Sequence, residues 1–264
     1  MKLACHKPEI IIMELEMSMF SFKKIVLSIL MTIVFQPVLK AAEMAEDSGA
    51  WLQSVAEGSL GVIDPSLKQS RIWLETQSRF DGDWSHWYQG MVRTAVGYSL
   101  SDRATIWAGY TFLPTQNLNH NADGLATGNG SYRGQQDIWP AFRYVLPTDL
   151  GTLSFRSMWE SNFVANEVRE RPRQMIKFMH PFEFEKRLSF IAWDEVFYRL
   201  NKTNWGGKAG FDQNRAFAGL GWTFNSNIRT EFGYMNQYLD MVKVNGSENL
   251  TMHHLAMASV FVSF

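Results

Sequence analysis

Arginine and glutamate recur at alternate positions along much of the chain, and these charges are the first candidates for chemistry. All 14 arginines lie after residue 41, and only 6 lysines occur in that part of the chain. A guanidinium group can hold a carboxylate through two hydrogen bonds, which an ammonium group cannot do. Eleven charged side chains fall on faces that the alternation assigns to one interior: Arg71, Glu75, Arg79, Arg93, Arg143, Arg156, Glu160, Glu195, Arg215, Arg229 and Glu231.

Two interpretations of this set remain open. The first is a selectivity filter or ligand site in which arginine exceeds acid. The second is a ladder of salt bridges that fills and rigidifies the interior. Buried charges must be paired to be tolerated, and this favours the ladder.

Two adjacent pairs invite other chemistry. Asp194 and Glu195 could act as acid and base, and His253 and His254 could bind a metal ion. Neighbours in a strand point to opposite faces, so neither pair can converge on one ligand without distortion. We therefore expect Glu195 to face inward and Asp194 to lie near the rim, and we predict no catalytic residues, no metal site and no cofactor.

The elements that must position these charges follow a period of two. In residues 71–80 most polar side chains share one face and most apolar side chains share the other, which indicates a two-sided strand. About eleven such segments occur, several of 10–14 residues. Soluble strands average about five or six residues, whereas membrane-spanning strands need about 9–11. We predict an all-β protein, a transmembrane antiparallel up-and-down β-barrel of 10–12 strands.

An even strand number is expected, because bacterial barrels return both ends of the chain to one side of the membrane. Ten strands result if residues 51–55 lie outside the wall, and twelve result if one strand is missed. Twelve is slightly favoured.

The composition excludes several classes of protein. A formal net charge of −1 and a pI of about 6.6 provide no basic field for nucleic acid. A mean hydropathy of −0.18 excludes a polytopic helical membrane protein. With 10 tryptophans and 19 phenylalanines, the chain is too aromatic to be disordered.

The first 41 residues have the pattern of a secretory signal peptide. Lys23 and Lys24 precede the apolar run 25–35, and small residues follow at 41–42. We predict cleavage near Ala41, a barrel over residues 42–264, and a true start at Met19. Cleavage would remove Cys5, the one cysteine in the chain.

Long and short connections alternate between the predicted strands. The long polar ones are 114–131, 164–172, 201–211 and 240–249, and the short ones are 101–102, 147–149, 185–187 and 225–227. Outer-membrane barrels place long loops outside and short turns in the periplasm. We therefore expect the long set outside. The basic run 169–173 is expected to be an outer loop, either in contact with lipopolysaccharide phosphates or solvated. The final Phe264, after alternating apolar residues, is the expected signal for barrel assembly.

Three sequence runs resemble a known family, the bacterial domain of unknown function 2490. They are Trp193–Phe197 (WDEVF), Phe211–Arg215 (FDQNR) and Glu231–Gln237 (EFGYMNQ). Glu75 with Arg79, Arg156 with Glu160, and His253 with His254 also match its pattern, although residues 155–160 carry fewer charges than is usual in the family. The resemblance spans residues 48–264. It implies an outer-membrane β-barrel and no particular activity.

The predicted location is the bacterial outer membrane. We expect a narrow passive channel for small polar or anionic solutes, with a closed structural or envelope-binding barrel that acts through its outer loops as the alternative. An enzyme is disfavoured, because no histidine is followed two residues later by the serine of the His-x-Ser pair that outer-membrane lipid hydrolases carry. The expected partners are membrane lipid, lipopolysaccharide and the barrel assembly machinery. Nucleic acid is not expected, and a monomer is favoured.

Overall fold

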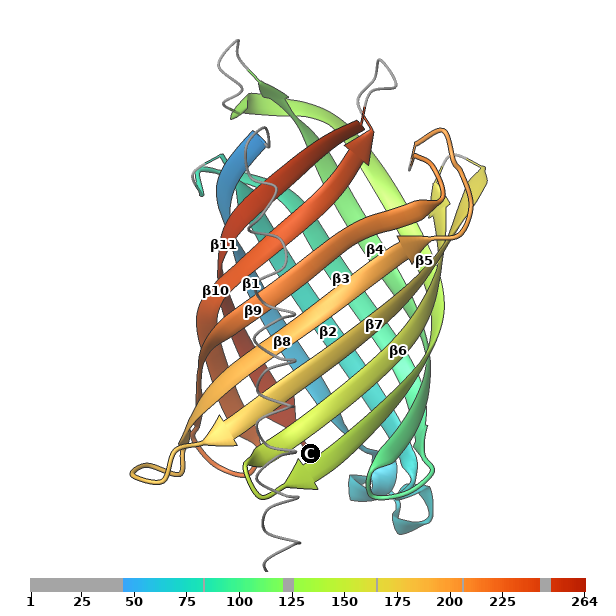
Figure 1. Ribbon diagram of the computed structural model, residues 1–264. Helices are drawn as coiled ribbons and strands as arrows, with labels where there is room; N and C mark the ends of the chain where they lie inside the picture. The colour runs from blue at the N-terminus through green and yellow to red at the C-terminus, as the bar shows by residue number, and fades with distance from the viewer. Residues whose placement is uncertain (1–44, 83, 121–125, 165, 206, 243–247) are drawn as a thin grey trace, which may run out of the picture. The chain divides into compact units, whose positions relative to one another are not determined.

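The computed structural model describes residues 45–82, 84–120, 126–164, 166–205, 207–242 and 248–264. Within these ranges the chain forms eleven strands, which close into one barrel (Figure 1). It also forms two single-turn 3-10 helices. The elements are β1 (Ala45–Ser59), η2 (Leu60–Val62), η3 (Pro65–Leu67), β2 (Ser70–Asp81), β3 (His86–Ser99), β4 (Ala104–His120), β5 (Ala126–Thr148), β6 (Gly151–Val164), β7 (Glu167–Pro181), β8 (Leu188–Arg199), β9 (Gly210–Thr223), β10 (Ile228–Val242) and β11 (Glu248–Ser263). None of the helices in these ranges has the length and apolar character needed to cross a bilayer.

The predicted all-β barrel of 10–12 strands is confirmed, but the expectation of an even number is wrong. Consecutive strands pair antiparallel, whereas β1 and β11 close the barrel as a parallel pair, from Ala45 opposite Thr251 to Glu57 opposite Ser263. Residues 51–55 lie in the wall as part of β1, and no twelfth strand occurs in the described ranges. An odd number of alternating strands leaves the first and last strands pointing the same way, so their seam must be parallel.

The two rims of the barrel differ in what they carry. The C-terminal rim holds Phe264 and the connections that follow the odd-numbered strands, including residues 182–187 and 224–227. The N-terminal rim holds the start of β1 and the connections that follow the even-numbered strands (Figure 1). The predicted signal peptide, residues 1–41, and the predicted start at Met19 lie outside the described residues.

The connections at the N-terminal rim are shorter than the sequence suggested. Most of the predicted loop 114–131 is strand, because β4 continues to His120 and β5 begins at Ala126. Most of the predicted loop 164–172 is also strand, since β6 continues to Val164 and β7 begins at Glu167. These segments are polar, but most of their residues extend the strands beyond the apolar band of the wall.

Closure of the seam depends on Gly58. The Ser59 amide donates a hydrogen bond of 2.9 Å to the Phe264 carbonyl. A Cβ atom on Gly58 would lie 2.3 Å from that carbonyl oxygen and 2.4 Å from the Phe264 ring. Only glycine therefore allows this close approach of the last residue to the first strand.

The outer and inner faces of the wall have opposite character. Large apolar side chains cover the outside, and Val96 and Phe232 are 65% and 66% exposed. Inside, two apolar clusters line opposite parts of the wall. One contains Trp51, Ile191, Trp193, Phe217, Met235, Leu255 and Met257, and the other contains Val55, Trp73, Ala95, Trp107, Trp139, Ala141 and Met158. A closed barrel with an apolar exterior is the architecture of proteins that span an outer membrane.

Candidate functional site in the barrel lumen

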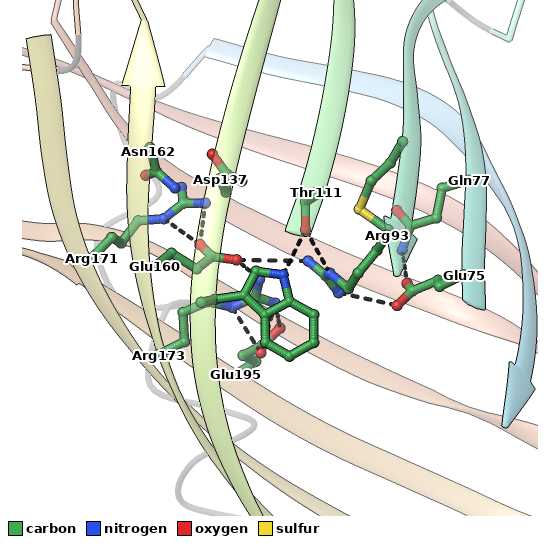
Figure 2. A network of polar contacts seen from close by, with 12 residues as sticks. Glu75, Gln77, Arg93, Thr111, Asp137, Glu160, Asn162, Arg171, Arg173 and Glu195 are labelled. Carbon is green, nitrogen blue, oxygen red and sulfur yellow. Dashed lines mark hydrogen bonds and ion pairs between the residues drawn. The ribbon is translucent and has the colours of Figure 1, made fainter. Parts of the chain in front are cut away.

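A network of paired charges crosses the lumen, and Glu160 lies at its centre (Figure 2). This glutamate projects from β6 and is fully buried. One of its oxygens accepts hydrogen bonds from Arg171 Nε at 2.9 Å and Arg171 Nη2 at 2.6 Å, and the other accepts one from Arg173. Arg93, from β3, places Nη2 3.6 Å from the second oxygen. The Glu160 carboxylate thus faces three guanidinium groups, two from β7 and one from β3.

Two further carboxylates extend this network. Glu75 pairs with Arg93 at 3.0 Å and accepts hydrogen bonds of 2.6 Å from Gln53 and Gln77. Glu195 accepts from Arg173 at 2.8 Å and from Arg156 at 2.9 Å. Each carboxylate is therefore satisfied by several donors, as a buried charge requires.

Toward the N-terminal rim the pairing continues through Asp212. Arg171 Nη1 lies 3.0 Å from Asp212, while Arg199 and Arg169 lie 3.8 and 4.0 Å away. Arg199 also forms an ion pair with Asp240.

Two separate clusters lie toward the C-terminal rim. In one, Glu57 pairs with Arg143 and, at 3.3 Å, with Arg71. In the other, Glu231 pairs with Lys177 at 2.6 Å and with Arg229 at 2.9 Å.

The eleven charged residues predicted from the sequence fall into these groups with two exceptions. The central network contains Glu75, Arg93, Arg156, Glu160 and Glu195, and the rim clusters contain Arg71, Arg143, Arg229 and Glu231. Arg79 and Arg215 also line the lumen. No carboxylate among the described residues lies within 4.0 Å of either guanidinium.

The strongest members of the network were not predicted from the sequence. The run 169–173, predicted as a basic outer loop, is part of β7, and Arg169, Arg171 and Arg173 point into the lumen and are buried. Their spacing of two residues, which continues to Lys177, was the signal that could have assigned them. Glu57, Arg199, Asp212 and Asp240 were missed as well.

Aromatic rings fill the space around the charges. Trp73 packs edge-on against Trp107 and Trp139, with ring centroids 5.5 and 5.9 Å apart. On the other side, Trp193 stacks on Phe217 at 5.4 Å. The guanidinium of Arg173 lies 4.3 Å from the Phe197 ring centroid.

The interior is packed from all sides. The fully buried side chains that face inward come from β1, β2, β4, β5, β6, β8, β10 and β11: Trp51, Glu75, Thr111, Asp137, Trp139, Glu160, Asn162, Ile191, Phe197, Met235 and Leu255. The barrel also contains a cavity of about 1020 Å³, whose lining includes Thr115 and Asp240 near one rim and Asn225 and Ser263 near the other. Its lining also includes Arg93, Glu160 and Arg173 of the central network, although these side chains are buried.

The prediction that Asp194 lies near the rim is wrong. It faces outward from the middle of β8, where the Asn214 side-chain amide donates to both carboxylate oxygens at 3.0 Å. Glu195 faces inward, so the two acids do point apart. The amide of Asn214 supplies the partner that an acid on the outer wall needs.

The two adjacent histidines also point in opposite directions. His254 faces outward, with Nδ1 2.6 Å from the Tyr234 hydroxyl. His253 lines the lumen cavity. There it meets Asp47 and Asp81, and one ligand atom from each of the three residues lies within 4.8 Å of the others. Among the described residues, these three form the one group whose ligand atoms lie close enough together to hold a metal ion. The sequence did not suggest this group.

Comparison with known proteins gives three findings. A family described as "Protein of unknown function (DUF2490)" matches residues 48–247, which confirms the resemblance drawn from the motifs. An uncharacterized protein of Methylorubrum extorquens is 26% identical over 225 residues, covering 85% of this chain and 91% of that protein. The solved structure of OmpT, an outer membrane protein of Vibrio cholerae, is similar with a TM-score of 0.35 and 13% identity, over 73% of this chain and 62% of that chain. The chain thus spans less than two thirds of that structure, and the likeness is too low to carry an argument.

Proposed function

We propose that this chain, which belongs to the DUF2490 family of proteins of unknown function, is a bacterial outer-membrane β-barrel whose lumen is closed by its own side chains. In this proposal the barrel does not conduct solutes. It binds from the outer half of its lumen and from its outer rim, and the N-terminal rim faces outside. Its role is binding rather than catalysis.

The observation that carries the proposal is the burial of the central charges. A water-filled passage exposes the side chains that line it, yet Glu160 and its partners Arg93 and Arg173 are buried. Their charges are neutralised by each other rather than by solvent. Ion pairs withdrawn from water need hydrogen bonds to their charged groups. Both carboxylate oxygens of Glu160 and of Glu195 accept such hydrogen bonds.

The outer wall supports the membrane location. Its exposed apolar side chains would be in contact with lipid, and lipopolysaccharide would surround the outer rim. The barrel assembly machinery is the expected partner during insertion.

A second candidate is the narrow passive channel for small polar or anionic solutes. One observation favours it: the lining of the lumen cavity includes residues near both rims. Arg79 and Arg215, which form no ion pair with the described residues, would give such a passage a preference for anions. Barrels of this size fall between side-chain-filled eight-stranded barrels and open porins of sixteen or more strands.

Solute passage can be tested by vesicle swelling. The purified protein is reconstituted into phospholipid vesicles, and swelling is followed by light scattering in solutions of a sugar, an amino acid and a small organic anion. Vesicles with a sixteen-stranded porin provide the permeable reference, and protein-free vesicles provide the baseline. The closed barrel predicts swelling at the baseline rate for all three solutes. Swelling above the baseline for the anion alone would replace the closed barrel with the anion channel.

A further inference from the structure

We infer that Arg79, Arg215, Trp51 and Tyr88 form a binding site for a small oxyanion, a carboxylate or a phosphate, in the lumen. This inference rests on the proposed closure in one respect, because the packed centre of the lumen is taken as the floor of the site. The ligand would enter through the N-terminal rim.

Arg215 has the charge and the free donors for such a ligand. It lies opposite Glu195 in the β8–β9 register, but Arg156 and Arg173 already occupy that carboxylate. Its Nε donates to Gln213 at 3.2 Å. Neither Nη nitrogen has a hydrogen-bond partner in the described part of the chain, and the side chain lines the cavity.

Arg79 contributes a second positive charge without a counterion. The residue is 5% exposed, and its guanidinium donates to Gln77 at 2.7 and 3.0 Å and to Gln89. These partners are neutral amides, which satisfy hydrogen bonds but leave the charge in place. A buried charge of this kind carries a large desolvation cost unless an opposite charge approaches it.

The two guanidiniums share one aromatic surface. Arg79 lies 4.0 Å and Arg215 lies 4.8 Å from the centroid of the Trp51 ring. The face of an indole attracts both cations, but it cannot cancel the repulsion between them. An anion placed near this ring would be attracted by both charges at once.

One further donor near the ring has no hydrogen-bond partner in the described part of the chain. Trp51 is only 2% exposed, and its buried indole N–H makes no hydrogen bond with the described residues. The Tyr88 side chain lies near this N–H and also lines the cavity. A buried N–H without a partner is costly in a folded protein. A ligand oxygen would relieve that cost.

The chemistry of these groups selects the ligand class. Guanidinium and indole groups only donate hydrogen bonds, so the ligand must accept them. Carboxylates and phosphates accept two hydrogen bonds from one guanidinium, which suits the free Nη nitrogens of Arg215. The site faces the lumen rather than the bilayer, which excludes a lipid headgroup and leaves a free anion.

The entrance to the cavity also favours anions. Arg133 and Arg169 flank Trp205 there, at 5.8 and 4.4 Å from its ring centroid. Arg133 is exposed and has no carboxylate within 4.0 Å in the described ranges. Positive charge at the mouth of a cavity raises the local concentration of anions.

Calorimetric titration of the folded protein in a non-ionic detergent tests the inference. Inorganic phosphate and succinate are titrated separately, so that the two oxyanion chemistries are distinguished. Wild type should bind at least one of them saturably. Arg215→Gln should weaken that binding about tenfold to a hundredfold, since it removes one charge-assisted pair of hydrogen bonds. Arg187→Gln is the matched control, because Arg187 lies in an exposed turn at the opposite rim, and it should bind as wild type does.

Two more variants separate binding from folding. Arg215→Lys keeps the charge and should retain part of the affinity, and Trp51→Phe removes the indole N–H and should weaken binding several-fold. Heat-modifiable migration on gels verifies that each variant is a folded barrel. Absence of saturable binding of both anions to wild type would overturn the inference, as would unchanged affinity in folded Arg215→Gln. Vesicle swelling tests closure independently, so anion binding in a barrel that conducts would refute closure and leave the site in place.

Discussion

Replacing Glu160 with glutamine removes one negative charge from the centre of the lumen while preserving the shape of the side chain. In the native barrel this carboxylate accepts hydrogen bonds from Arg171 at 2.6 and 2.9 Å and from Arg173, and it lies 3.6 Å from Arg93. The variant leaves these three guanidiniums facing a neutral amide, whose own N–H groups point at positive charge.

The size of the destabilisation depends on whether water reaches the network. Removing one partner of a buried ion pair costs about 3–5 kcal/mol. In water, two unit charges 4 Å apart interact by only about 1 kcal/mol. Because Glu160 is fully buried, we expect a loss of about 3–5 kcal/mol in the free energy of unfolding.

The assay is reversible urea unfolding of the barrel in lipid vesicles, followed by tryptophan fluorescence and by heat-modifiable migration. Glu185→Gln is the control, because Glu185 lies in an exposed turn and pairs only with Arg187 in the described ranges. Its stability should remain close to that of wild type. A loss of about 1 kcal/mol or less in Glu160→Gln would refute the reasoning, since it would mean that solvent screens the network.

Three other predictions follow from the fold. Gly58→Val should lower the yield of the heat-modifiable folded form, because its side chain would collide with Phe264 at the parallel seam; a matched Gly134→Val change, at a site where the nearest atom is 3.2 Å away, should lower it much less. A single cysteine at Asn204 should react with an impermeant maleimide in intact cells, and one at Ser226 should not, because these exposed residues lie at opposite rims; the reverse labelling would invert the topology. The side-chain hydrogen bond from Arg187 lowers the pKa of Glu185 from 4.5 to about 2. Because the pair is exposed, the stability that it provides is small; it should be complete above pH 4.5 and be lost as the pH falls toward 2. A small difference between Glu185→Gln and wild type that persists below that pKa would contradict this.

The wall of the barrel could be predicted from the sequence because it depends on local alternation. A strand in lipid must place apolar side chains outside and can place charges inside, and this pattern is visible in each segment. The strand number could not be settled in the same way. Whether β1 joins the wall depends on its pairing with β11, more than 190 residues away along the chain, and no local pattern reports that contact.

The candidate site could be predicted only in part. The run 169–173 contains four charged residues, and this polar composition led to its prediction as an outer loop. In the structure Pro172 lies in β7 opposite Trp159. That no carboxylate in the described part of the chain pairs with Arg79 or Arg215 could not be foreseen either. It depends on which carboxylates reach which guanidiniums across the lumen, and these distances are set by the tilt and stagger of the closed barrel.

Single-channel conductance in planar lipid bilayers tests the central claim, closure of the lumen, most directly. The purified barrel is added to a bilayer in concentrated potassium chloride, and insertion is verified by recovery of folded protein from the membrane. A lumen closed by the network around Glu160 predicts no stepwise current from inserted wild-type protein. Steady steps of current with a preference for anions would contradict closure and would identify the protein as a narrow channel.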